Sequence, residues 1–273
     1  MVSTGDTRTV RFTSSEHTRD RSPRARQDRI RRTVVEVGSV RIEELAAELG
    51  VTPMTIRRDL DFLQSQGWLR KVRGGATAEP SAVHHGDVRH RRQYLADVKA
   101  RLAEAALRQV RPGQSVMLDE STTGLALARQ LHRRSPLTVI TNFCPVVAEL
   151  GGTPGIDLVS LGGAYFPAYD AFLGPRTVDG VASLHADLLI ASTTAVTRGQ
   201  CYHQSQETVA VKRALMAACD RSVLVVDHTK FTRRGLYRLA PLTEFDLVVV
   251  DDGIDPADLA GLREAGVEVL VAT

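Results

Sequence analysis

The chain has 273 residues, a formal net charge of +3, 43% hydrophobic residues and 25% charged residues. This composition is typical of a globular protein with a small and a larger domain, and it excludes a mainly disordered chain. No apolar run is long enough for a membrane span, and the polar first twenty residues lack the apolar core of a signal peptide. The cysteines, Cys144, Cys201 and Cys219, have no metal-type spacing, so we expect reduced thiols in a cytoplasmic protein without metal or cofactor.

Positive charge is concentrated towards the N-terminus. Residues 1–78 contain 15 basic and 10 acidic residues, whereas the remainder contains 20 basic and 22 acidic residues. An excess of basic side chains favours contact with DNA phosphates, although basic segments also serve as solubilising tails. Residues 1–23 are polar and poor in large apolar side chains, so we expect a disordered basic tail there.

Two helices are expected after this tail. Apolar residues recur at helical spacing over residues 26–37, and a short extended piece is expected at 40–42. A second helix is expected over residues 43–49, with Gly50 at its C-terminal end.

The segment from Pro53 to about Gln64 is the most informative in the chain. Thr52 is a good N-cap, and Pro53 suits the first helical position because its missing N–H is not needed there. Arg57 and Arg58 lie off the apolar stripe near the helix start, where arginines can reach phosphates or guanine edges. Alone, this helix is equally consistent with an ordinary amphipathic surface helix. After the preceding helix and tight turn, it predicts a helix–turn–helix.

A basic hairpin follows the expected recognition helix. Residues 68–73 alternate apolar and basic side chains and run into Gly74-Gly75, which predicts a wing that lies along phosphates. Residues 24–78 are therefore expected to form a winged helix–turn–helix domain. The predicted DNA-binding residues are Thr52, Pro53, Met54, Thr55, Arg57, Arg58, Arg70, Lys71 and Arg73.

This segment, from near Arg26 to Thr77, resembles the DeoR-type family of bacterial transcriptional repressors. The matching residues are Glu44 to Ala46, Val51, Thr52, Thr55 to Leu60, Leu63, Gly67 and Arg73 to Ala76. The resemblance implies that the partner is double-stranded operator DNA. It also implies that the rest of the chain is a sugar-phosphate-sensing domain with a fold similar to ribose-5-phosphate isomerase.

Residues 79–92 are expected to be a linker that ends in the basic cluster Arg89 to Arg92. His84, His85 and His90 raise the possibility of a metal site, but no carboxylate or cysteine partner has ligand spacing, so a solvated linker is favoured.

Residues 93–273 alternate apolar runs with helical patterns. This alternation predicts a Rossmann-like α/β domain, with a largely parallel sheet and helices on both faces. Strands are expected at 115–118, 137–140, 156–161, 186–191, 222–226, 245–250 and 267–269, and helices at 99–109, 122–132, 145–150, 178–184, 208–218 and 255–265.

Ligands of such sheets bind beyond the carboxyl ends of the strands. After the first strand, Asp119 is followed by Ser121, Thr122 and Thr123, which suit either a phosphate cradle or a plain helix N-cap. The family has glycine where this chain has Ser121, which puts close backbone approach to a phosphate in doubt.

Other strand ends also carry polar or glycine residues. Asp227 to Phe231 resembles an Asp-x-Ser-Lys-Phe element of the family, in which Lys230 is the natural cation for a phosphate or sugar oxygen. Glu207, Val211, Lys212 and Arg213 resemble a family helix that faces the pocket. The predicted effector-binding residues are Asp119, Ser121, Thr122, Thr123, Thr141, Asn142, Gly162, Gly163, Glu207, Asp227 and Lys230.

The combined prediction is a self-associating, non-enzymatic repressor of a carbohydrate-catabolism operon, released by a phosphorylated sugar or related metabolite. One alternative is a sugar-phosphate isomerase with a DNA-binding domain, whose candidate acid–base groups are Asp119, Asp187, Glu207, Asp227 and Lys230. Another is a DNA-binding protein with a ligandless C-terminal domain.

Overall fold

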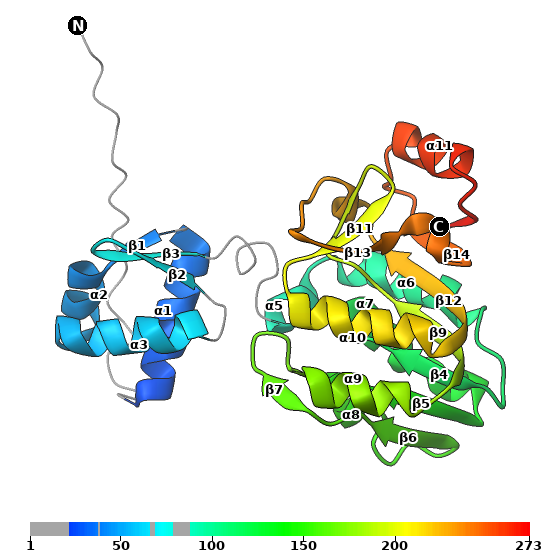
Figure 1. Ribbon diagram of the computed structural model, residues 1–273, viewed down its shortest axis with the longest axis horizontal. Coiled ribbons are helices and arrows are strands. Elements are labelled where there is room, and N and C mark those ends of the chain that lie inside the picture. The colour runs from blue at the N-terminus through cyan, green and yellow to red at the C-terminus, as the bar shows by residue number, and fades with distance from the viewer. Residues whose placement is uncertain (1–21, 38, 66–68, 79–87) are drawn as a thin grey trace, which may run out of the picture.

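The computed structural model describes residues 22–37, 39–65, 69–78 and 88–273 (Figure 1). Most of the predicted tail and the first part of the predicted linker, including His84 and His85, lie outside the described residues, as do the side chains of Arg70 and His90. None of the helices in the described ranges combines the length and apolar character that a membrane span requires.

The N-terminal domain is a winged helix–turn–helix, as predicted. Three helices surround a small antiparallel sheet with the strand order β1-β3-β2 (Figure 1). The helices are α1 (Pro23–Val37), α2 (Ile42–Leu49) and α3 (Pro53–Ser65), and the strands are β1 (Ser39–Arg41), β2 (Leu69–Val72) and β3 (Gly75–Ala78).

Two glycines permit the tight geometry of this domain. Gly50 ends α2 in the left-handed region with a φ of 63°, which is costly for other residues. A Cβ on Gly75 would lie 2.1 Å from the carbonyl oxygen of Val40, so only glycine lets β3 pair with β1 there. Val37, at the end of the apolar stripe expected over residues 26–37, is 64% exposed. The core includes residues that recur at helical spacing: Ile30, Val34, Leu45, Ile56, Leu60 and Leu63.

The C-terminal domain contains a seven-stranded parallel sheet, with the order β15-β14-β12-β9-β4-β5-β6. The strands are β4 (Ser115–Leu118), β5 (Leu137–Thr141), β6 (Ile156–Ser160), β9 (Ala186–Ala191), β12 (Cys219–Val226), β14 (Leu247–Asp251) and β15 (Val269–Ala272). The predicted parallel α/β architecture is therefore confirmed.

Helices cover both faces of this sheet (Figure 1). Successive strand residues point to opposite faces, so Val116 and Leu118 join one core cluster and Met117 joins the other. On the first face lie α6 (Ala96–Leu107), α7 (Thr122–Ala128) and α8 (Cys144–Leu150); on the second lie α9 (Pro175–Ala182), α10 (Gln206–Ala217) and α11 (Pro256–Glu264).

The structure corrects the predicted elements in several places. Residues 88–92, which we expected to belong to the linker, lie in helix α5 (Val88–Gln93), and Val88 is buried in the core of the second domain. The helix expected over 122–132 ends at Ala128, and a 3₁₀ turn follows at Leu131–Arg134. Short strands of three to five residues outside the parallel sheet were not predicted, because they lack the continuous apolar runs that mark the buried strands of that sheet. They are β7 (Ala164–Phe166), β8 (Ala171–Leu173), β10 (Ala195–Thr197), β11 (Gln200–His203) and β13 (Tyr237–Pro241).

Candidate DNA-binding and effector sites

The recognition helix α3 has one buried and one exposed face. Ile56 and Leu60 are fully buried, whereas Arg57 and Arg58 are exposed. The helix start is capped, because the Thr55 N–H donates to Thr52 Oγ1 at 3.2 Å. Met54 is 54% exposed. The predicted base-reading residues of α3 therefore share an accessible surface near its N-terminus.

A buried ion pair that was not predicted fixes α3 against α1. The Asp59 carboxylate accepts a hydrogen bond from Arg26 Nε at 2.6 Å and another from Gln27 Nε2 at 2.9 Å. The Asp59 side chain is only 5% exposed, so this contact holds the helix rather than facing DNA. Arg57 and Arg58 thus project from a fixed helix, which favours specific contacts.

The wing is joined to the recognition helix. Lys71 forms an ion pair with Asp61 of α3, and its backbone N–H donates to Gln64 Oε1 at 2.7 Å. Arg73 is exposed beside Gly74, whose φ of 79° makes the tight wing turn. Of the two predicted wing contacts whose side chains the structure describes, Arg73 is exposed and Lys71 is already paired with Asp61.

In the second domain, the chain changes direction across the sheet at β4. This strand lies between β5 and β9, so the carboxyl ends of β4 and β9 flank the switch point where such sheets bind ligands. Asp119 follows β4 and is fully buried; Oδ2 accepts from the Ser192 N–H after β9 at 2.6 Å. Asp119 therefore ties the two strand ends together.

Lys212 of α10 meets two carboxylates at this point. Its ammonium pairs with Asp119 and lies 3.0 Å from Glu120 Oε1, and all three side chains are 3% exposed or less. Burial lowers the pKa of Lys212, but the carboxylates of Asp119 and Glu120 raise it further, so the net shift is upward. The positive charge of Lys212 is therefore balanced by carboxylates of the protein itself, and this ion pair braces the switch point.

Several predicted hydroxyl and amide groups are bound by the protein itself. Ser121 caps α7, since its Oγ accepts from the Gly124 N–H at 2.9 Å. Thr141 donates to the Leu118 carbonyl at 2.8 Å, and Asn142 Nδ2 donates to the Phe172 carbonyl at 2.9 Å. Thr122 and Thr123 are buried in the first turn of α7. The structure therefore supports the N-cap interpretation of Ser121.

Three other predicted residues, Gly162, Gly163 and Glu207, make contacts of their own. Gly162 and Gly163 follow β6, the edge strand, and a Cβ on Gly163 would lie 2.1 Å from Thr177 Oγ1 of α9. That glycine is required by helix packing. Glu207 is exposed and accepts from Ser205 Oγ at 2.8 Å.

Asp227 and Lys230 lie together after β12. Asp227 Oδ1 accepts from the Thr229 N–H at 3.1 Å, which caps the 3₁₀ turn His228–Phe231, and Oδ2 lies 3.5 Å from Lys230 Nζ. Burial raises the pKa of Asp227, but Lys230 and other partners lower it more. The Lys230 side chain keeps 16% exposure, which leaves it accessible to a ligand.

Four cations interact electrostatically with Asp227 or with one another, and we call them the cationic cluster: Arg91, Lys99, Lys230 and Arg233. Burial lowers the pKa of Lys230 to about 8, and the positive charges of Arg233 and Arg91 contribute to this fall. Burial also lowers the pKa of Lys99 to about 8, assisted by the charge of Lys230. Cations that lower one another's pKa values at one place favour the binding of an anion.

One acid–base candidate of the isomerase alternative, Asp187, lies apart from Asp119 and Asp227. Asp187 accepts from the Ser115 N–H at 2.7 Å and from Ser115 Oγ at 2.6 Å. Ser115 begins β4, so Asp187 lies at the amino ends of the strands, opposite Asp119 and Asp227. Its role is to join β4 to β9.

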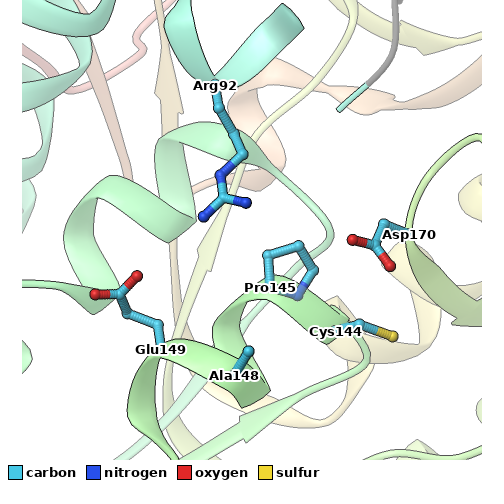
Figure 2. Close-up of a pocket in the computed structure, with 6 residues that line it drawn as sticks. All are labelled: Arg92, Cys144, Pro145, Ala148, Glu149 and Asp170. Atoms are coloured by element: carbon cyan, nitrogen blue, oxygen red, sulfur yellow. The ribbon is translucent and has the colours of Figure 1, made fainter. Parts of the chain in front are cut away.

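A separate pocket of about 420 Å³ lies between α5 and α8 (Figure 2). It is lined by Arg92, Cys144, Pro145, Ala148, Glu149 and Asp170, none of which was predicted to bind an effector. Burial raises the pKa of the Cys144 thiol, so this cysteine is not activated. The described part of the chain contains no cluster of side chains suited to a metal ion.

Comparison with known protein families finds a match for each of the two domains. The model of the DeoR-like helix-turn-helix domain matches residues 26–82, and that of the DeoR C-terminal sensor domain matches residues 95–252. The chain belongs to the DeoR family. It is therefore a DNA-binding transcriptional regulator with a sensor domain, which confirms the prediction of a regulator and rejects that of an enzyme.

Named relatives of this DeoR-family chain include repressors. A putative aga operon transcriptional repressor of Escherichia coli O157:H7 is 30% identical over 90% of this chain and 93% of its own length. The glycerol-3-phosphate regulon repressor of Haemophilus influenzae is 31% identical over 83% of this chain and 89% of its own. Among solved structures, ribose 5-phosphate isomerase A of Methanocaldococcus jannaschii aligns with a TM-score of 0.37 and 15% identity, over 50% of this chain and 54% of its own.

Proposed function

We propose that this DeoR-family regulator represses a carbohydrate-catabolism operon in the bacterial cytoplasm, and that a phosphorylated sugar or related anionic metabolite releases it from the operator. The observation that carries the proposal is the cationic cluster around Asp227. A phosphate dianion beside Lys230 would offset the like-charge repulsion there and gain charge-assisted hydrogen bonds. Two relatives named for the aga operon and the glycerol-3-phosphate regulon support this class of effector.

On the DNA side, we assign base reading to the exposed face of α3 and phosphate contact to the wing. The start of α3 presents Arg57 and Arg58 on a surface fixed by Asp59. In helix–turn–helix proteins, such residues enter the major groove and make the base contacts. Arg73 on the wing turn suits a backbone phosphate.

The effector site is tested by the substitution Lys230→Ala. We expect the variant to bind operator DNA normally but to lose roughly ten- to a hundredfold in effector affinity, since charge-assisted contacts are worth about 1.5–3 kcal/mol. The effector would be found by thermal-shift screening of sugar phosphates, including glycerol 3-phosphate and hexose phosphates. The operator is selected from genomic DNA fragments by its binding to the wild-type protein. Titration of the protein–operator complex with the effector then measures release of the protein from DNA.

One control variant and one pH titration accompany this experiment. Arg234→Ala removes an exposed cation of the same loop, which does not belong to the cationic cluster, and should leave the effector response unchanged. Wild-type effector affinity should fall as the pH rises through about 8, where Lys99 and Lys230 lose their protons. If Lys230→Ala responds as wild type does, the effector site lies elsewhere. If no sugar phosphate stabilises the wild type, the ligandless alternative is favoured.

We also propose a homo-oligomer, a dimer or tetramer, assembled through the sensor domain. One winged helix covers a short half-site, and pairing two of them raises affinity and matches a two-fold operator. Light scattering of the full chain at micromolar concentration should therefore give at least twice the monomer mass of 29.8 kDa. A monomer both with and without operator DNA would contradict this prediction.

A further inference from the structure

Helix α5 is bound directly to the cationic cluster. The ammonium group of Lys99, only 5% exposed, donates to the Tyr94 carbonyl at 2.7 Å and also to the Arg91 carbonyl, at the C-terminal end of α5. The Arg233 guanidinium lies over the Tyr94 ring, 5.9 Å from its centre. Two cations of the cluster, Lys99 and Arg233, therefore also hold the end of this helix.

The same helix adds positive charge to the cluster. Arg91 belongs to α5, and its charge contributes to the lowered pKa values of both Lys99 and Lys230. Asp227 supplies the opposing charge in this group. Like charges in a partly buried site repel one another, so docking of α5 works against this repulsion.

A bound anion would offset the repulsion that opposes docking of α5. Bound beside Lys230 and Lys99, it neutralises the repulsion that Arg91 meets and favours the charged form of Lys99. A charged ammonium is also the better donor to the carbonyls at the end of α5. Anion binding and α5 docking must then strengthen each other, because thermodynamic coupling is reciprocal.

We propose that α5 is the element that couples the sensor to the DNA-binding domain: an anionic effector in the cationic cluster docks α5 through Arg91 and Lys99. In sequence, α5 comes directly after residues 79–87, which join the two domains. A change in how firmly α5 is held therefore acts on the chain that carries the winged helix. This inference rests on the effector site proposed above.

The neighbouring arginine provides a matched control. Arg92 lies on the same helix but lines the pocket with Cys144, Glu149 and Asp170, as Figure 2 shows. Arg91→Gln and Arg92→Gln thus remove the same charge from adjacent positions, and only the first removes it from the cationic cluster. Arg91→Lys keeps a charge at the critical position.

The test is hydrogen exchange of the α5 amides in the full chain, with inorganic phosphate as the probe. Phosphate should slow exchange over residues 88–95 by about tenfold in the wild type, in Arg92→Gln and in Arg91→Lys. In Arg91→Gln the effect of phosphate should shrink to about twofold or less. Thermal melts of each variant show that the sensor domain remains folded.

The outcomes separate the two proposals. If phosphate stabilises the wild type but not Lys230→Ala, and α5 exchange is nevertheless unchanged, the coupling role of α5 is wrong while the effector site stands. An equal response in Arg91→Gln and Arg92→Gln also overturns the coupling role. If phosphate does not stabilise the wild type at all, the anion site fails, and the coupling role fails with it.

Discussion

Replacing both Arg57 and Arg58 by Ala should abolish specific operator binding while leaving the winged helix folded. Each side chain is exposed near the start of α3, and a good base contact is worth about 1–3 kcal/mol. Losing two such contacts should bring operator affinity close to that for unrelated DNA. Fluorescence anisotropy at fixed salt, with operator and scrambled duplexes, measures the difference.

A matched control separates base reading from simple loss of charge. Arg29 is also exposed in this domain, but it lies on α1, where it pairs with Glu48 at 2.9 Å. Arg29→Ala should therefore leave the preference for operator over scrambled DNA unchanged. Arg73→Ala should weaken binding to both duplexes and reduce the salt dependence by about one phosphate contact. Wild-type specificity in the α3 double variant would refute the assignment of α3 as the reading helix.

Much of the fold could be predicted from the sequence, because its helices and strands carry regular patterns of buried apolar residues. The strands at 115–118 and 186–191 were predicted with the bounds that the structure gives, since continuous apolar runs mark strands buried on both faces. The start of α3 was also predictable, because Thr52 and Pro53 are local signals that do not depend on the rest of the fold. Recognition of the family placed Asp227 and Lys230 in one element, and they do lie together.

The sequence was less informative where side chains from distant elements meet. Lys99 contributes to the cationic cluster and Lys212 to the switch point, yet neither was among the predicted effector-binding residues. A signal was available: Lys212 lies four residues after Thr208 and three before Leu215, on the buried stripe of α10. A lysine in such a stripe must be paired. Its partners, Asp119 and Glu120, are about ninety residues away, so only the fold identifies them.

Gly163 shows how one sequence pattern can serve two uses, whereas a Cβ on Gly162 would have open space around it. Glycines after a strand suggested that the backbone there approaches a ligand. At Gly163, however, the Thr177 hydroxyl takes the space that a side chain would fill. The sequence pattern is the same for both uses of glycine, because it records the absence of a side chain and not what fills the space. Only the strand order, which puts β6 at the edge of the sheet, distinguishes a glycine that packs against a helix from one that approaches a ligand.

The second large effect is expected at Lys212. In Lys212→Met, the carboxylates of Asp119 and Glu120 would remain buried without their shared cation. Breaking a buried ion pair by removing one partner costs about 3–5 kcal/mol, because an uncompensated charge is left inside. We therefore expect a large loss in the free energy of unfolding of the sensor domain, measured by calorimetry or denaturant titration.

Two further variants test that reason for the loss. Arg176→Met removes a positive charge from an exposed position on α9 and should alter stability by no more than about 0.5 kcal/mol. Adding Glu120→Gln to Lys212→Met removes one of the stranded charges and should restore part of the stability. If Lys212→Met is as stable as Arg176→Met, the lysine does not brace the switch point, and the ends of β4 and β9 are held by the Asp119–Ser192 hydrogen bond instead.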